Sequence, residues 1–106
     1  MSSTVRNNLE LQRFELHDGG ELVAFLQYRQ RGQLVDLLHT ETLPSKEGHG
    51  YGSQLVASAL DEIRRRGRQV RPYCPFVRSY LADHGELRDL VPHELRAKFE
   101  LDGGED

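Results

Sequence analysis

The sequence predicts a mixed α/β fold (α+β mixed sheet), in which helices pack against a sheet of antiparallel and parallel strands. The first half of the chain alternates apolar and polar residues, with turn signals between the runs, as successive short strands do. From residue 52 onward the apolar residues instead recur with the period of a helix. A short apolar run follows that helix, and a strand–helix–strand crossover makes its two strands parallel.

The first half is predicted to form an antiparallel meander of three strands. The first strand has two alternating apolar pairs, with a phase slip near Arg13 that is typical of a bulge. These pairs are Leu9 with Leu11 and Phe14 with Leu16. The Asp-Gly-Gly turn at 18–20 predicts a hairpin that returns through residues 21–29. A second polar turn at 30–33 leads into a buried strand over residues 34–40.

The second half begins with a loop over residues 42–50 and continues as an amphipathic helix. One face of this helix carries Leu55, Val56, Ala59, Leu60 and Ile63. Gly67 stands where a C-terminal glycine cap is expected. Residues 69–73 then predict a further strand, which the crossover places parallel to the strand before the helix.

Two more helices are predicted after this strand. Pro75 suits the first turn of a second helix, which Gly85 ends. The apolar face of the second helix is made of Phe76, Val77, Tyr80 and Leu81. Pro92 opens a short third helix with Val91, Leu95 and Phe99 on one side. We expect the tail, residues 102–106, to be frayed.

The bulk properties limit the class of protein. With 106 residues the chain is expected to form a single domain, 1–106, with a core of about residues 8–99. A net charge of −3 argues against general nucleic-acid binding, and no apolar run reaches the roughly 20 residues that cross a bilayer. The N-terminus lacks the apolar segment of a signal peptide. A single cysteine excludes an internal disulfide, so a reducing, cytoplasmic setting is expected.

The buried strand is connected to the amphipathic helix by a glycine-rich turn, Gly48-His49-Gly50-Tyr51-Gly52-Ser53. Glycines let the backbone adopt positive φ and approach a ligand closely. The free N–H groups and the dipole of the following helix attract anions, so the turn suits phosphate or pyrophosphate. A P-loop would need a lysine here, and the dinucleotide fingerprint would need glycine where Ser53 stands. A flexible loop without a ligand explains the turn equally well.

Two separate parts of the chain resemble the GNAT superfamily of N-acetyltransferases. Residues 39–41 and 47–56 resemble its acetyl-CoA motif A. Residues 72–77 (Pro-Tyr-Cys-Pro-Phe-Val), with Tyr80-Leu81, resemble the signature of a compact subgroup whose members are about as long as this chain. The subgroup pattern is of the His-Thr-x-Val, Gly-x-Gly and Cys-Pro-Phe-Val type. The resemblance covers approximately residues 10–92 and implies a short GNAT-like acyl-CoA N-acyltransferase fold with acetyl-CoA (coenzyme A) as cofactor.

The resemblance implies an N-acetyltransferase that moves an acetyl group from acetyl-CoA to a primary amine, on a protein lysine or a small amine. Segments present in longer members usually build the acceptor side, so an open, shallow acceptor groove is expected. A monomer or weak homodimer is expected, without membrane or nucleic-acid partners. The alternatives are a non-catalytic acyl-CoA-binding or regulatory module, and an interaction domain whose glycine turn binds no nucleotide.

The chain departs from the family pattern at three positions. Glu47 replaces the Arg or Gln that usually precedes the glycine turn, and a carboxylate beside a pyrophosphate is unfavourable unless it turns away. Gly85 and Leu87 replace the Pro and Tyr of the closing motif. These departures bear on the affinity for coenzyme A and on the role of the closing segment.

The resemblance also indicates how the cofactor is held. In the family, the strand bearing residues 39–42 splays from its neighbour, so its free backbone groups pair with the pantetheine arm. The glycine turn holds the pyrophosphate. The expected cofactor-binding residues are Thr40, Thr42, Gly48, His49, Gly50, Tyr51, Gly52 and Ser53.

Three side chains are candidate catalytic residues: Cys74, His39 and Glu41. Cys74 precedes Pro75, where the helix dipole and free N–H groups stabilise a thiolate, and it matches the cysteine of the compact subgroup, for which a catalytic role is suspected. It would be an acetylated intermediate, a polar wall of the site or an inert buried cysteine. His39 would accept the amine proton or simply end a strand. Glu41 shares a face with His39 by strand parity.

Three further features have both a functional and a structural interpretation. Asp36 lies in an apolar run, where desolvation would raise its pKa and make it a reserve general base. A zinc site of Cys74 with His39, His49 and His84 lacks a close ligand pair, so no metal is expected. A basic stretch either solvates a helix C-terminus or forms a patch near a phosphorylated ligand; it comprises Arg64, Arg65, Arg66, Arg68 and Arg71.

Overall fold

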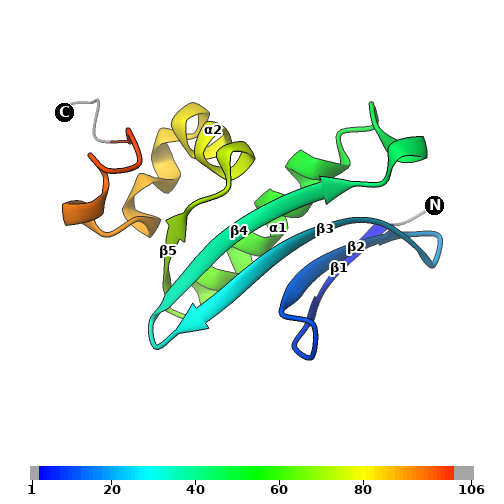
Figure 1. The fold of residues 1–106 in the computed structure, drawn as a ribbon, viewed down its shortest axis with the longest axis horizontal. Helices are drawn as coiled ribbons and strands as arrows, with labels where there is room; N and C mark the ends of the chain where they lie inside the picture. The colour runs from blue at the N-terminus through cyan, green and yellow to red at the C-terminus, as the bar shows by residue number, and fades with distance from the viewer. Residues whose placement is uncertain (1–2, 102–106) are drawn as a thin grey trace.

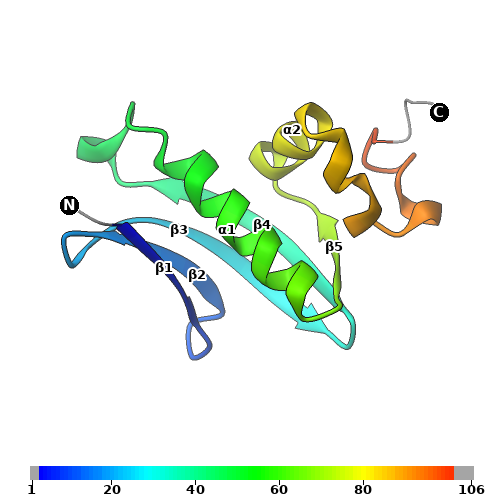
Figure 2. The ribbon, with the colours of Figure 1, turned by 180° about the vertical axis from the view of Figure 1, so that it is seen from behind.

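A five-stranded sheet forms one layer of the protein, and the long helix α1 packs across one of its faces (Figures 1 and 2). The computed structural model describes residues 3–101. The strands are β1 (Ser3–Asn8), β2 (Arg13–Asp18), β3 (Glu21–Arg31), β4 (Leu34–Thr42) and β5 (Gln69–Pro72). The helices are α1 (Tyr51–Arg65), α2 (Pro75–Asp83) and the 3-10 helices η1 (Pro44–Lys46), η2 (Gly85–Leu90) and η3 (His93–Leu95).

The strands follow one another across the sheet in chain order. Pairing is antiparallel from β1 to β4, whereas β5 pairs parallel with β4 after the α1 crossover. The turn between β2 and β3 depends on two glycines, because Gly19 and Gly20 both adopt positive φ, at 63° and 85°. The predicted mixed sheet, its hairpins and its parallel crossover are therefore confirmed.

The N-terminal hairpin differs from the prediction, because Leu9 and Leu11 lie in a turn and not on a strand. Their side chains are 73% and 51% exposed. The Leu11 N–H donates to Asn8 Oδ1 at 3.1 Å, and this local bond competes with continued strand pairing. The phase slip near Arg13 is therefore the end of a turn. The strand before it, β1, was not predicted, because five of its six residues are polar.

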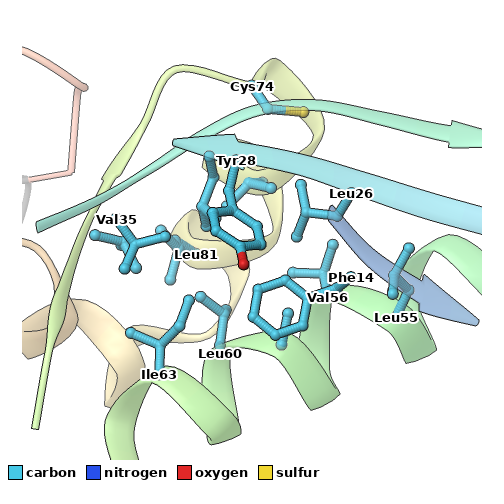
Figure 3. Close-up of a cluster of buried hydrophobic side chains, with 14 of the residues drawn as sticks. Phe14, Leu26, Tyr28, Val35, Leu55, Val56, Leu60, Ile63, Cys74 and Leu81 are labelled. Atoms are coloured by element: carbon cyan, nitrogen blue, oxygen red, sulfur yellow. The ribbon is translucent and has the colours of Figure 1, made fainter. Parts of the chain in front are cut away.

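The core lies between α1 and the sheet (Figure 3). All five residues of the predicted helix face are buried: Leu55, Val56, Ala59, Leu60 and Ile63. The strands contribute Phe14, Leu26, Tyr28 and Val35 among others, and the Tyr28 hydroxyl donates to Asn7 Oδ1 at 2.7 Å. Each fully buried side chain of this size contributes about 1.5–3 kcal/mol, which holds α1 on this face.

The other face of the sheet, which we call the open face, has no helix over it within residues 3–101 (Figure 1). Its side chains come from alternate positions of the same strands and are mostly polar or charged. α2 and the segments after it pack instead beside the β5 edge of the sheet (Figures 1 and 2). Within residues 3–101, the open face is therefore not covered by a helix where the β4–β5 ladder ends.

The C-terminal half follows the prediction in most respects. Gly67 adopts φ 69° directly after α1, and α2 begins at Pro75 and ends before Gly85. Of the predicted apolar face of α2, Val77 and Leu81 are buried but Phe76 is 43% exposed.

The third predicted helix is only the single 3-10 turn η3 after Pro92, although Val91 and Phe99 are buried as expected. The predicted frayed tail, 102–106, lies outside the described residues. Among the residues that are described, no helix has both the length and the apolar character needed to cross a membrane.

Candidate active site

The glycine turn leaves the first N–H groups of α1 without helical partners. Gly50 is the N-cap of α1 with φ 74°, and Gly48 adopts φ 89°, so both positions favour glycine. No side chain caps the helix, and its first hydrogen bond runs from Gln54 N–H to Gly50 O at 3.1 Å. The N–H groups of residues 51–53 precede this bond, so they are placed to bind an anion.

A depression of about 310 Å³ lies against this turn. Thr42 at the end of β4 and Phe76 of α2 complete its lining. Lys46 and Glu47 contribute one charge of each sign, and Lys46 Nζ also lies 3.2 Å from Glu21 Oε1. Glu47 is therefore one of the residues that line the depression. Lys46 is a nearby cation whose role the motif did not indicate.

Gly52 has a packing role in addition to its place in the motif. Its backbone is helical, and a Cβ at this position would lie 3.0 Å from Cζ of Phe76. The lack of a side chain lets the Phe76 ring lie over the first turn of α1. The glycine thus sets how closely α2 approaches α1 at the depression.

A second depression, of about 420 Å³, shares Ser53 and Phe76 with the first and extends along α2. We call the two together the interhelix groove. Tyr80, which was predicted to be a core residue, is only half-buried and lines it. The His84 ring stacks on Tyr80 with centroids 4.0 Å apart, and its Nδ1 lies 2.7 Å from Tyr80 O. The sequence analysis considered His84 only for a zinc site, because its place beside the groove depends on how α2 packs against α1.

Two aromatic residues of the turn anchor it to the sheet. The His49 and Tyr51 rings stack with centroids 5.2 Å apart. The Tyr51 hydroxyl donates to the Asp18 carboxylate, and this hydrogen bond raises the pKa of Tyr51. The side chain of Tyr51 therefore ties α1 to the β2–β3 hairpin.

The strands β4 and β5 part next to this groove. Their ladder ends at the pair Leu37 and Pro72, after which Cys74 N–H still donates to Leu37 O at 2.9 Å. No ladder pair with β5 follows for residues 38–42, so this stretch of β4 has a free backbone edge within the described chain. Such an edge can pair with an extended ligand.

A bulge at Leu38 sets which side chains of β4 face which way. Gln27 of β3 pairs with His39, whereas its neighbour Tyr28 pairs with Leu37, so Leu38 is the extra residue. Beyond the bulge, Thr40 and Thr42 lie opposite the core residues Leu26 and Ala24 and face the α1 side. The intervening residues, His39 and Glu41, face the open side.

The candidate catalytic residues consequently form two pairs on opposite faces of β4. On the open face, His39 Nε2 lies 3.1 Å from Glu41 Oε1, and both side chains are about half exposed. On the α1 face, Cys74 is buried and its Sγ lies 3.3 Å from Thr40 Oγ1. Cys74 is the N-cap of α2 (Figure 3). The predicted pairing of His39 with Glu41 is present, but neither residue contacts Cys74.

The expectation that Asp36 is a reserve general base is wrong. Burial alone would raise its pKa, but hydrogen bonds from Arg71 and Arg29 hold the pKa of Asp36 below its ordinary value. The closest of these contacts joins Arg71 Nε to Asp36 Oδ1 at 2.6 Å. A carboxylate covered by guanidinium groups stays ionised and has no free oxygen directed at a substrate.

The arginines in the last turn and at the C-cap of α1 do not reach the interhelix groove. Arg64 pairs with Asp89 at 2.9 Å, and Arg65 and Arg66 pair with acidic residues on their own helix. These arginines lie at the end of α1 opposite to the glycine turn. Within residues 3–101, no three His, Cys, Asp or Glu side chains gather closely enough to hold a metal ion.

The order of elements, the parted strands and the groove at the start of α1 together define a GNAT type of α/β fold. A model of the GCN5-related N-acetyl-transferase family matches residues 13–90. The chain therefore belongs to the GCN5-related N-acetyltransferase family.

A solved structure supports the fold assignment. The chain is similar to a GCN5-like candidate N-acetyltransferase from Staphylococcus aureus, with a TM-score of 0.64 at 18% identity over 83% of this chain and 86% of that one. It also matches N-acetylglutamate synthase from Neisseria gonorrhoeae, solved with coenzyme A and N-acetyl-glutamate, at 17% identity and a TM-score of 0.48. That match covers 87% of this chain but only 23% of the longer protein.

Proposed function

We propose that the protein is an acetyl-CoA-dependent N-acetyltransferase of the compact GNAT subgroup, acting on a primary amine. One observation carries this proposal. The interhelix groove begins at the free N–H groups of residues 51–53 and is lined by Thr42 and Phe76, each two residues from the Thr40–Cys74 pair where β4 and β5 part. Membership of the family agrees with it.

The residues present fit coenzyme A. The N–H groups of residues 51–53 would hold the pyrophosphate, with Lys46 as the adjacent cation and the turn residues 48–50 shaping the backbone. The free edge of β4 would pair with the pantetheine arm. Acetyl-CoA would supply the activated thioester acyl group.

The two side-chain pairs suit the two sides of the transfer. The His39–Glu41 pair on the open face would accept the proton of an amine that arrives from that side. The Cys74–Thr40 pair on the α1 face would donate a proton to the leaving thiolate, or Cys74 would carry the acetyl group itself. Because the pairs lie on opposite faces, direct transfer needs no contact between His39 and Cys74.

Titration with coenzyme A, followed by calorimetry and thermal shift, tests the binding step. Binding should stabilise the protein by about 2.7 kcal/mol when the ligand is at a hundred times its Kd. Lys46→Gln should weaken binding, whereas Lys98→Gln, outside the groove, serves as the matched control. No binding at millimolar coenzyme A would refute the proposal.

Release of free thiol from acetyl-CoA over a panel of amines tests transfer. Cys74→Ala should slow it, and intact-mass analysis without an acceptor would reveal an acetyl adduct if Cys74 carries the group. Equal rates for the wild type and Cys74→Ala would remove Cys74 from the mechanism.

A non-catalytic acyl-CoA-binding module is the second candidate. Two observations favour it: Glu47 lines the groove, and Cys74 is buried, with Thr40 as its one side-chain hydrogen-bond partner within residues 3–101. Coenzyme A binding without turnover on any amine of the panel would support this module.

With either function, the single free thiol fits the proposed reducing, cytoplasmic setting.

A further inference from the structure

Three arginines gather around one buried carboxylate on the open face. Asp36 is fully buried; Arg71 Nε lies 2.6 Å from its Oδ1, and the Arg29 guanidinium lies 3.0 Å from its Oδ2. Arg31 Nε is further away, at 3.8 Å from Oδ2. We call Arg29, Arg31 and Arg71 the arginine cluster. Three positive charges against one negative charge leave a formal charge of +2, in a chain whose net charge is −3.

The cluster has donors left to bind a second anion. A guanidinium group has five N–H donors, and Arg29 directs two of its nitrogens at Asp36. Arg31 lies beyond hydrogen-bond distance of that carboxylate. The side chains of Arg29 and Arg31 are 48% and 60% exposed, so their remaining donors reach solvent.

Further positive charge lies beyond Arg71. The Arg71 guanidinium lies 5.7 Å from the centroid of the Tyr73 ring, and Lys98 Nζ lies 5.5 Å from the same ring. Cationic groups therefore extend from β3 across β4 and β5 toward the C-terminal segment. A surface with this positive charge attracts a negatively charged partner.

The cluster is close to the proposed acceptor side of the active site. Asp36 and Arg71 form the second-last pair of the β4–β5 ladder, directly before the strands part. On the same face of β4, Asp36 and His39 are separated by the bulge and lie opposite Arg29 and Gln27 of β3, which are two residues apart, or about 7 Å along a strand. If the amine of a ligand lies at His39, another group of the same ligand, a few bonds away from the amine, would lie over the arginine cluster.

We propose that the open face binds a peptide in which an acidic residue lies beside the acceptor amine, and that the arginine cluster binds its carboxylate. This inference rests on the proposed acetyltransferase function. A polyamine would instead bring positive charge toward a surface that already carries +2. The half-exposed His39 offers a small amino acid few contacts, whereas an extended peptide can spread across an open strand surface.

Binding of labelled peptides, measured by fluorescence anisotropy in the presence of coenzyme A, tests the proposal. Three peptides would differ only in the residues flanking one lysine, which would be Glu, Gln or Lys. The Glu peptide should bind about threefold more tightly than the Gln peptide and the Lys peptide most weakly, with smaller differences at high salt.

Charge reversal at Arg31 provides the matched variant. Arg31→Glu leaves both hydrogen-bonding arginines of Asp36 in place, so the fold should be retained, as circular dichroism would verify. The variant should bind the Glu peptide about tenfold more weakly and lose the preference over the Lys peptide. Arg65→Glu, an exposed arginine on the far side of α1, should leave the order of the peptides unchanged.

The outcomes separate this proposal from the function on which it rests. Equal binding of the Glu and Gln peptides, equal effects of the two variants, or tighter binding of a single-stranded oligonucleotide would overturn the acidic-peptide assignment. A preference for the Glu peptide without any thiol release would leave the peptide surface intact and refute acetyl transfer. Turnover with no preference among the three peptides would support acetyl transfer and refute the acidic-peptide assignment.

Discussion

The two faces of the sheet bury neighbouring residues by different means. Asp36 and Leu37 are consecutive in β4, and both are fully buried. Leu37 lies in the core beneath α1, whereas Asp36 on the open face is covered by the side chains of Arg29 and Arg71. Long arginine side chains can thus cover a strand as fully as a helix does. The first kind of burial depends on apolar contact, and the second depends on charge.

Truncation on the covered face should have the largest effect on stability. We expect Leu37→Ala to lower the free energy of unfolding by about 3 kcal/mol, because it loses transfer energy and leaves a cavity under α1. Urea denaturation would measure this. Leu38→Ala, at the partly exposed bulge, is the control and should cost less than about 1 kcal/mol. Similar costs for both would mean that the core is not anchored at Leu37.

Removal of charge on the open face should have a smaller effect that depends on pH. Asp36→Asn should cost about 2 kcal/mol at neutral pH, because three guanidinium groups lose their shared carboxylate. The pKa of Asp36 is lowered in the folded protein. Its stabilisation is therefore complete above the unfolded value near 3.8 and is lost as the pH falls through the lower, folded value.

The difference in stability between the wild type and Asp36→Asn should accordingly shrink in acid. Leu37→Ala should show no such convergence, so the pair of variants distinguishes the two kinds of burial. Denaturation curves recorded from neutral pH to about pH 2 would measure both differences. A constant difference for Asp36→Asn would mean that charge does not hold the open face together.

A substitution in the groove should alter ligand binding more than stability. Gly52→Ala places a methyl group against the Phe76 ring, while alanine gains about 1 kcal/mol of helix propensity over glycine. We expect unfolding free energy to change by less than about 1 kcal/mol, and coenzyme A affinity to fall because the ring shifts within the groove. Phe76→Leu in the same chain should restore part of the affinity. An unchanged affinity in Gly52→Ala would exclude Phe76 from the binding surface.

The smallest effect is expected at the exposed pair on the open face. Glu41→Gln removes one partner of a half-exposed ion pair, so stability should change by about 0.3 kcal/mol. Thermal unfolding of the wild type and of Glu41→Gln would measure this difference in stability. Thiol release by this variant should fall nonetheless, since His39 loses the carboxylate that orients it; full activity would argue against the pair as the proton acceptor.

Most of the fold could be predicted from local sequence signals. The face of α1, the glycine turns and the Pro75 start of α2 follow from periodicity and backbone chemistry, which act over a few residues. β1 was missed because an edge strand with polar residues has no apolar alternation. Leu9 and Leu11 were misplaced because two apolar residues in a turn imitate such alternation.

The candidate site was less predictable because it depends on contacts between distant residues. The environment of Asp36 is set by arginines from β3 and β5, which no local pattern brings together. The contribution of Lys46 and His84 to the groove likewise depends on how η1 and α2 pack beside α1. The pairing of His39 with Glu41 could be predicted, since it needs only strand parity.

The bulge at Leu38 makes the assignment of side chains to the two faces depend on a single residue. Strand parity has a period of two, so loss of this residue would rotate the following four residues of β4 to the opposite side. His39 and Glu41 would then face α1, and the two threonines would face solvent. A one-residue deletion here, unlike any substitution, would exchange the inner and outer surfaces of the strand, so the length of β4 constrains the protein as strongly as its composition does.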